Sequence, residues 1–252
     1  MSTLHGKHAL ITGAGRGIGA AIAERLAADG VRLTLLGRTR ESLDAVAERL
    51  GASVIGVVTC DVTDSDAVTR SVQAIPTVDI LINNAGQAHS APLVRTTDED
   101  WQRMMAVNLT APFVCARAVL PGMLQSGWGR IVTIASTAAL RGYPYVTAYT
   151  AAKHGVVGLT RALALEVATK GVTVNAVCPG FTETDILRES VATIVARTGR
   201  TEVEARATLS AHNPQGRFIT PDDVAAAVSW LVSSEASAIT GVAMPVSGGE
   251  IS

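Results

Sequence analysis

The sequence predicts a single-domain α/β protein built on a doubly wound parallel sheet of seven strands, with helices on both faces. Short apolar or β-branched runs alternate with longer amphipathic segments along all 252 residues. The runs are continuously apolar, which is typical of parallel strands buried on both sides. The chain has no internal repeat, low-complexity segment or linker. We therefore expect one domain that spans residues 1–252.

Strands and helices are expected in strict alternation through the first half of the chain. Each predicted strand is an apolar run that ends in glycine or a polar residue, and each predicted helix has apolar residues at helical spacing. The strands are expected at 8–13, 31–37, 53–61 and 78–86. The helices are expected at 18–30, 41–51, 64–75 and about 97–119, the last interrupted near Pro112.

The second half continues the alternation with one exception. Strands are expected at 129–136, 172–180 and 241–249, with a long helix at 148–170. The segment 182–215 is long, polar and only partly helical, which predicts a substrate lid or loop; a surface decoration is the alternative. The chain is then expected to divide into a core of alternating strands and helices (6–180), this segment, and a C-terminal helix and strand (216–252).

Composition excludes several classes of function. A hydrophobic content of 48%, a charged content of 17% and a formal net charge of −1 indicate a packed globular protein, with no sign of a nucleic-acid or membrane partner. The three cysteines and five histidines are scattered without metal-ligand spacing. The first ten residues, MSTLHGKHAL, lack the apolar stretch of a signal peptide. A soluble cytoplasmic protein without a metal is expected.

The stretch TGAGRGIG (12–19) lies directly between the first predicted strand and the first predicted helix. Glycines permit a tight turn and a close approach of the backbone, and a helix N-terminus presents unpaired N–H groups to a pyrophosphate. Ile18 replaces the third glycine of the usual spacing, and the glycines that match a known variant are Gly13, Gly17 and Gly19. The context predicts a Rossmann-type dinucleotide site.

The end of the second predicted strand indicates which dinucleotide is bound. NAD-binding folds place an acidic residue there for the ribose 2′-hydroxyl. This chain has Gly37 followed by Arg38, with Arg40 two residues on and Arg16 in the glycine turn. Guanidinium groups pair well with a phosphate, so we expect NADP(H) to be preferred, with NAD(H) possible.

Two polar residues are unusual in the apolar helix segment AYTAAKHGVVGLT (148–160). Tyr149 and Lys153 are four residues apart and therefore share one helix face. Ser136 ends the fifth predicted strand, where open α/β sheets bind their ligands, and Asn108 follows the fourth strand. These four residues are the candidate catalytic group.

The order of these motifs resembles the short-chain dehydrogenase/reductase family. The matching pieces run from about residue 6 to 249: TGAGRGIG, Asp61, NNAG (83–86), Asn108, Ser136, Tyr149-x-x-x-Lys153 and CPGFTET (178–184). The resemblance implies that Tyr149 is the proton donor in carbonyl reduction and that Lys153 lowers the pKa of Tyr149 and bonds the nicotinamide ribose. It also implies that Ser136 bonds the substrate carbonyl and that Asn108 holds a water linked to Lys153.

The same resemblance implies a set of cofactor-binding residues around the turn and the strand ends. Asp61 and Val62 would contact the adenine, Asn84 the adenosine ribose, and Thr184 the carboxamide. The full expected set is Gly13, Gly15, Arg16, Gly17, Ile18, Gly19, Arg38, Asp61, Val62, Asn84, Ala85, Gly86, Tyr149, Lys153, Pro179, Gly180, Thr182 and Thr184.

The C-terminal third resembles two branches of that family. One contains the 3-oxoacyl-acyl-carrier-protein and 3-ketoacyl-CoA reductases, with the polyketide ketoreductases, and the other the 3-hydroxybutyrate dehydrogenases. The second branch holds a free carboxylate with polar residues, whereas this chain has Ala88, Ala138 and Val146 at the matching positions and agrees only at His89. An unpaired carboxylate at an apolar wall is costly, so a 3-oxoacyl thioester or neutral ketone is favoured. The candidate substrate residues are His89, Ala138, Tyr143, Tyr145 and Val146.

The expected function is therefore reduction of a 3-oxoacyl thioester (CoA or acyl-carrier-protein) by NADPH. The alternatives are a broad ketone reductase or secondary alcohol dehydrogenase, a 3-hydroxybutyrate-type dehydrogenase, and a catalytically inactive nucleotide-sensing protein. The resemblance also implies a homotetramer or dimer, which would pair through the helices that carry Asn108 and Tyr149 and through the C-terminal strand.

Overall fold

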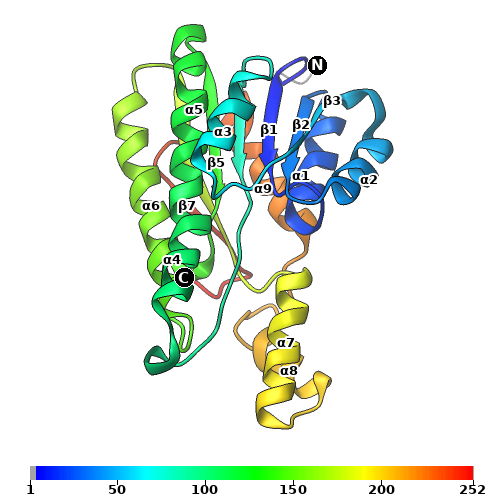
Figure 1. Ribbon diagram of the computed structural model, residues 1–252, viewed down its shortest axis with the longest axis vertical. Coiled ribbons are helices and arrows are strands. Elements are labelled where there is room, and N and C mark those ends of the chain that lie inside the picture. Colours follow the sequence, from blue (N-terminus) through cyan, green and yellow to red (C-terminus); the bar gives the residue numbers. More distant parts are fainter. Residues whose placement is uncertain (1–3, 252) are drawn as a thin grey trace.

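The structure, a computed structural model, describes residues 4–251 and confirms the predicted fold class. Residues 1–3 and 252, at the ends of the expected domain, lie outside the described residues. Seven parallel strands form one sheet in the order β3-β2-β1-β4-β5-β6-β7 (Figure 1). The strands are β1 (His8–Thr12), β2 (Arg32–Gly37), β3 (Val54–Thr59), β4 (Ile80–Asn83), β5 (Gly129–Ile134), β6 (Val172–Pro179) and β7 (Ala243–Val246).

Helices cover both faces of the sheet (Figure 1). On one face α1 (Gly17–Ala28), α2 (Arg40–Leu50) and α9 (Pro221–Val232) bury a core that includes Ile22, Leu26, Leu43 and Val228. On the other face α3 (Ser65–Gln73), α5 (Ala111–Ser126) and α6 (Thr147–Val167) bury a second core around Val68, Val119 and Met123. The inner strands β1, β4, β5 and β6 are buried from both sides, as their composition predicts, whereas the edge strands β3 and β7 are partly exposed.

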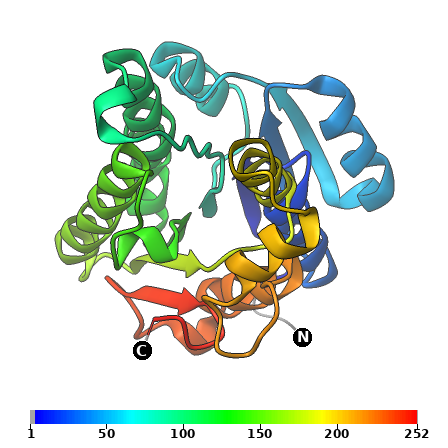
Figure 2. The same cartoon turned by 90° about the horizontal axis from the view of Figure 1, so that it is seen from below.

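The strand order reverses between β1 and β4, and the loops that follow these two strands diverge there. In open α/β sheets this reversal leaves a crevice at the carboxyl ends of the strands, where ligands bind. The segment that contains α7 (Asp185–Thr198) and α8 (Glu202–Ser210) extends beyond this same end of the sheet (Figures 1 and 2). The fold therefore brings the predicted glycine turn, the strand ends and the predicted lid to one side of the molecule.

Two predicted segments differ from the structure. The interruption expected near Pro112 is a π-helical turn, Ala106–Thr110, that lies just before the proline: α4 (Asp98–Met105) passes through it into α5, which continues to Ser126. Pro112 is the second residue of α5, which directly follows this turn. The segment 182–215 is also more regular than predicted, because α7 and α8 bury their own cluster of Leu187, Val191, Ala205 and Leu209.

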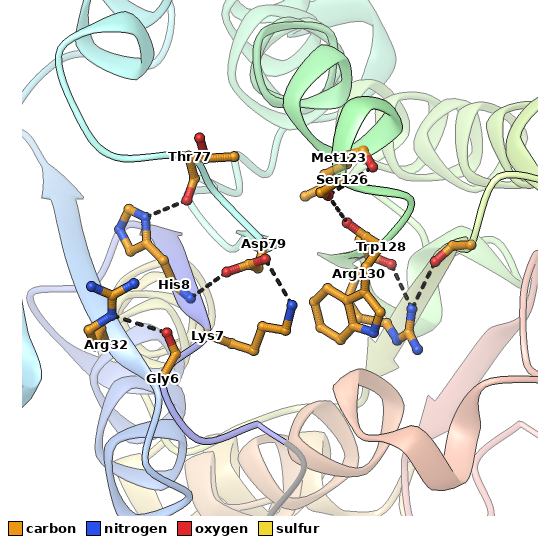
Figure 3. Close-up of polar contacts among 12 residues, drawn as sticks. Gly6, Lys7, His8, Arg32, Thr77, Asp79, Met123, Ser126, Trp128 and Arg130 are labelled. Carbon is orange, nitrogen blue, oxygen red and sulfur yellow. Dashed lines mark hydrogen bonds and ion pairs between the residues drawn. The ribbon is translucent and has the colours of Figure 1, made fainter.

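A polar cluster lies at the opposite, amino end of the sheet (Figure 3). The ring of His8 is buried and bonds the carbonyl of Thr77 and the hydroxyl of Thr34, and burial lowers the pKa of this histidine. The carboxylate of Asp79 accepts hydrogen bonds from the His8 backbone and from Lys7 Nζ. The cluster ties β1 to β2 and to the start of β4, far from the crevice.

The helical stretch Asp98–Ser126 is the one segment within residues 4–251 that is long and apolar enough to cross a membrane. Half of its most apolar window is buried inside the protein. A core helix of a globular protein meets the same criterion, so the stretch is weak evidence of a span.

Candidate active site

The glycine turn lies between β1 and α1 and is shaped by close backbone contacts. A Cβ built on Gly13 would lie 2.9 Å from Asn84 Nδ2, and one built on Gly17 would lie 3.3 Å from Thr184 Cγ2. Both glycines have positive φ values, which other residues adopt at a cost. The turn thus needs glycine because of its conformation and because β4 and the start of α7 approach it closely.

The N-terminus of α1 is a candidate for holding a pyrophosphate, because it directly follows the glycine turn. Its N-cap residue, Arg16, makes no side-chain cap, and its first turn contains no acidic residue. The helices α3, α4, α8 and α9 are capped by Asp64 and by three threonines, whereas α2, α5, α6 and α7 lack a side-chain cap as α1 does. What distinguishes α1 is its position directly after the glycine turn. The free N–H groups and the positive end of the helix dipole at α1 are thus available to an anion. The residues present fit a dinucleotide.

Several residues predicted to bind the cofactor also have structural contacts. Asn84 Nδ2 donates to the carbonyls of Thr12 and Gly13, at 2.9 and 3.1 Å, and so fastens the glycine turn to β4. Asp61 accepts hydrogen bonds from the backbone and the hydroxyl of Thr63, which lower the pKa of its carboxyl. Val62 is buried in the core beneath this loop. Sequence alone did not indicate these bonds.

Of the three arginines predicted near the cofactor, two have an acidic partner in the structure and one lies exposed at the end of β2. Arg38 is exposed directly after β2, and its charge helps to lower the pKa of Asp61. Arg40 forms an ion pair with Asp44 at 2.8 Å within α2 and so has a partner already. Arg16 reaches across the turn to Asp185 of α7, with 2.9 Å between the guanidinium and the carboxylate. Arg16 and Arg38 are the arginines at the mouth of the crevice.

The remaining predicted cofactor residues line the strand ends that face this turn. Ala85 and Gly86 follow β4, and Pro179 and Gly180 end β6. The Thr182 hydroxyl donates to the Gly180 carbonyl at 2.9 Å, and that of Thr184 to Thr182 at 3.2 Å. Gly15 lies against Ser42 of α2, while Ile18 and Gly19 belong to the first turn of α1.

Tyr149, Lys153 and Ser136 converge at the carboxyl end of β5. Ser136 lies two residues beyond the strand and caps the short turn Thr137–Ala139 (η4), accepting a hydrogen bond from the Ala138 N–H. The Tyr149 hydroxyl is hydrogen-bonded to the Ser136 side chain. Lys153 Nζ lies 5.7 Å from the centre of the Tyr149 ring and donates to the Ile134 carbonyl at 2.8 Å. Two hydroxyls and a buried ammonium thus meet at one strand end.

Burial dominates the ionisation of this group. Lys153 is only 5% exposed, and burial lowers the pKa of its ammonium to about 8. Burial also raises the pKa of Tyr149, while its bond with Ser136 acts in the opposite direction. Burial therefore outweighs the bond with Ser136 in the protein by itself. The expected lowering of the Tyr149 pKa by Lys153 and the oxidised nicotinamide stays a prediction for the protein with its cofactor bound.

Asn108 approaches Lys153 from the π-helical turn. A Cβ built on Gly86 would lie 3.1 Å from Asn108 Oδ1 and 3.7 Å from Lys153 Nζ, so the two side chains flank this glycine. Asn108 is fully buried, and its Nδ2 donates to the carbonyls of Gln87, at 2.9 Å, and Met104, at 3.1 Å. The amide therefore holds the loop after β4 beside the lysine.

The five candidate substrate residues are not all placed alike. Ala138 is buried beside Ser136, and Val146 is half-buried at the start of α6. Tyr145 is exposed, with its carbonyl accepting from the Ala91 N–H at 2.8 Å. His89 lies 3.6 Å from the Asp100 carboxylate in the first turn of α4. The Tyr143 hydroxyl bonds both Thr137 and Glu250.

Sequence reasoning missed three neighbours of this site. Cys178, on β6, is buried near Lys153 and Ser136, and burial raises the pKa of its thiol to about 11. Thr137 and Glu250 hold Tyr143 in place. Their signal was weak, because Glu250 is 107 positions away from Tyr143 in the sequence. These residues come together because β5 pairs with β6 and β6 pairs with β7.

Comparison with known proteins agrees with this geometry. The family model described as short chain dehydrogenase matches residues 7–195. The granaticin polyketide synthase putative ketoacyl reductase 1 of Streptomyces violaceoruber is 44% identical, over 96% of this chain and 92% of its own length. The 3-oxoacyl-(acyl-carrier-protein) reductase FabG of Escherichia coli is 39% identical over 97% of both chains. The crystal structure of a single-residue variant of the actinorhodin polyketide ketoreductase with NADPH is 38% identical and superposes with a TM-score of 0.93, over 99% of both chains.

Proposed function

We propose that the chain, which belongs to the short-chain dehydrogenase family, reduces a ketone to a secondary alcohol with NADPH. The substrate we propose is a 3-oxoacyl thioester on CoA or acyl carrier protein, and the product is the 3-hydroxyacyl thioester. The observation that carries this proposal is the meeting of the Ser136 and Tyr149 hydroxyls beside buried Lys153. The names of the granaticin and Escherichia coli relatives support the substrate class.

The side chains at the end of β5 are suited to handle a carbonyl oxygen. NADPH, when bound, supplies the hydride. The Ser136 hydroxyl donates a hydrogen bond to the carbonyl oxygen, where negative charge develops. The Tyr149 phenol donates the proton, and its raised pKa keeps it protonated at neutral pH, as a donor requires. Lys153 remains an ammonium below about pH 8 and orients the site through its bond to β5.

The glycine turn and the two exposed arginines are proposed to hold the cofactor. The free N–H groups of α1 would bind the pyrophosphate, and Arg16 and Arg38 would bind the 2′-phosphate. Arg40 is a weaker candidate because Asp44 occupies its guanidinium. NAD(H) would fit the same site without the phosphate contacts, so we propose it as the poorer cofactor.

We also propose roles for α7 and α8 and an assembly state for the protein. We propose that α7 and α8 form a lid over the substrate, because they extend from the carboxyl edge of the sheet beside Thr184. We also propose a cytoplasmic homotetramer, or a dimer, without a membrane or nucleic-acid partner. The near-zero net charge supports the absence of these partners.

The decisive experiment measures cofactor oxidation with acetoacetyl-CoA and a panel of neutral ketones, using NADPH and NADH in parallel. We expect turnover of the thioester and a kcat/KM for NADPH well above that for NADH. Arg38→Asp should lower the ratio of kcat/KM for NADPH to kcat/KM for NADH at least about tenfold, because it removes a charged contact with the 2′-phosphate and adds a repulsive charge. Failure to reduce any ketone would contradict the enzyme assignment, and equal kcat/KM for the two cofactors would contradict the role of Arg38.

A further inference from the structure

Glu250 places a carboxylate in the wall of the site that the proposed chemistry does not use. It lies in the segment after β7, half-buried, and accepts a hydrogen bond from the Tyr143 hydroxyl. That hydroxyl is also 2.8 Å from Thr137 Oγ1, and Thr137 directly follows Ser136. On its other side the carboxylate approaches the turn after β6, because a Cβ built on Gly180 would lie 2.9 Å from Glu250 Oε2. A negative charge is thus fixed between two segments of the proposed site.

The Tyr143 ring keeps this arrangement rigid. Its edge contacts Phe181, at 6.3 Å between ring centres, and His212, at 6.0 Å, so the loop after β5, the turn after β6 and the end of α8 meet there. Burial and the Glu250 carboxylate both raise the pKa of Tyr143, so the phenol stays a hydrogen-bond donor. Glu250 is held by the core of the site and is not a free surface acid.

The cationic side chains around Glu250 neutralise its negative charge only in part. The guanidinium of Arg141 lies 5.0 Å from the Tyr143 ring but is exposed, so solvent and salt screen it. Arg217 is nearby in the loop before α9 and is paired with Asp223 at 2.6 Å. Lys153 donates a hydrogen bond to the carbonyl of Ile134, at the end of β5. The wall next to Ser136 therefore carries a half-buried negative charge.

We infer that Glu250 is a specificity-determining residue that disfavours free 3-oxo acids relative to neutral esters and thioesters. This inference rests on the proposed function. The carboxylate of a 3-oxo acid is two bonds from the carbonyl carbon, so it remains close to the wall once Ser136 holds the carbonyl. Like charges repel each other at the effective dielectric constant of a protein surface, and about 1 kcal/mol of repulsion changes a rate roughly fivefold. A thioester carries no charge at that position.

The test compares two substrates of similar size, methyl acetoacetate and the acetoacetate anion, each with saturating NADPH at pH 7. The wild type should favour the ester strongly. Glu250→Gln keeps an acceptor for Tyr143 but removes the charge, and it should lower the ester-to-anion ratio of kcat/KM at least fivefold, mainly through faster reduction of acetoacetate. Glu250→Asp keeps the charge and should largely preserve the ratio. Glu235→Gln removes one charge from the exposed turn Ser234–Ala236 and should leave the ratio unchanged.

The outcomes distinguish failure of the inference about Glu250 from failure of the proposed function. If Glu250→Gln reduces the ester but retains the wild-type ratio, the inference about Glu250 is wrong and the proposed function stands. If the Gln variant does not fold, judged by circular dichroism and thermal melting, Glu250→Ala takes its place with the same expected ratio. If the wild type reduces neither substrate nor any other ketone, the proposed function itself fails, and the inference fails with it.

Discussion

Tyr149 and Lys153 are both desolvated at the end of β5, and the consequences for the two groups differ. The phenol is kept in its protonated form, which suits a proton donor. The ammonium, with a pKa of about 8, is charged at neutral pH and bonds the backbone of β5. The two residues should therefore respond differently to substitution.

Tyr149→Phe should reduce kcat by about a hundredfold or more while the Kd for NADPH stays unchanged, because only the proton donor is lost. Lys153→Ala should lower kcat and also weaken NADPH binding, since it removes the proposed ribose contact. Stopped-flow rates and fluorescence titration of NADPH measure these two effects. His154→Gln is the matched control, because His154 is exposed on the same helix and bonds only within it. Substantial activity in Tyr149→Phe would show that the pair are merely neighbours.

Single residues show where sequence reasoning stops. The spacing of Tyr149 and Lys153 predicted their shared helix face, because it depends only on helix geometry. The contact between Glu250 and Tyr143 joins residues 107 positions apart, and no local pattern specifies it. The bonds from Asn108 to Gln87 were missed for the same reason. Tertiary hydrogen bonds of this kind depend on how the strand ends meet.

At the scale of elements, the glycine turn and α7 are joined by the ion pair between Arg16 and Asp185. The pair is exposed, so it contributes at most about 1 kcal/mol. A guanidinium–phosphate contact is stronger, about 1.5–3 kcal/mol. Asp185 also bonds Arg188, so it keeps a partner if Arg16 turns away. We therefore expect Asp185 to compete weakly with the 2′-phosphate for Arg16.

Asp185→Asn should lower the Kd for NADPH by up to about fivefold and leave that for NADH unchanged, as measured by fluorescence titration. Arg16→Ala should weaken NADPH binding, and in the Arg16→Ala background the effect of Asp185→Asn should vanish. Asp222→Asn, which alters a first-turn acid of α9, is the control for a general effect on helix charge. Equal changes for both cofactors would mean that Asp185 acts on the lid and not on Arg16.

Most elements could be predicted because their signals are local. The continuous apolar runs of β1, β4 and β5 and the amphipathic pattern of α2 indicate strands and helices directly. The π-helical turn at Ala106–Thr110 could not be predicted, since its residues also suit an α-helix. The prediction rested on Pro112, which lies in regular α-helix after this turn. The helices α7 and α8 were underestimated because their polar sequences bury only a small cluster of side chains.

At the scale of the whole molecule, the alternation of elements predicted the sheet and the side of it that binds ligands, because parallel strands connected by helices have few possible arrangements. The assembly state could not be predicted from the residues. The structure adds one observation: Phe113 and Leu124 of α5 are 43% and 42% exposed, and Leu165 of α6 is 82% exposed. Contiguous exposed apolar surface marks protein–protein interfaces, and these side chains are the candidates for such a surface on α5 and α6.

We therefore expect these helices to pair with a second copy of the chain, and Leu165→Glu should weaken that pairing because a buried, unpaired charge is costly. Light scattering coupled to size exclusion should give four times the chain mass, or twice for a dimer, and a smaller mass for the variant at equal concentration. Val203→Glu is the matched control, since Val203 is 77% exposed on α8 of the lid, away from α5 and α6. A wild type with the mass of one chain would contradict the assembly, and dissociation by Val203→Glu would place the interface on the lid instead.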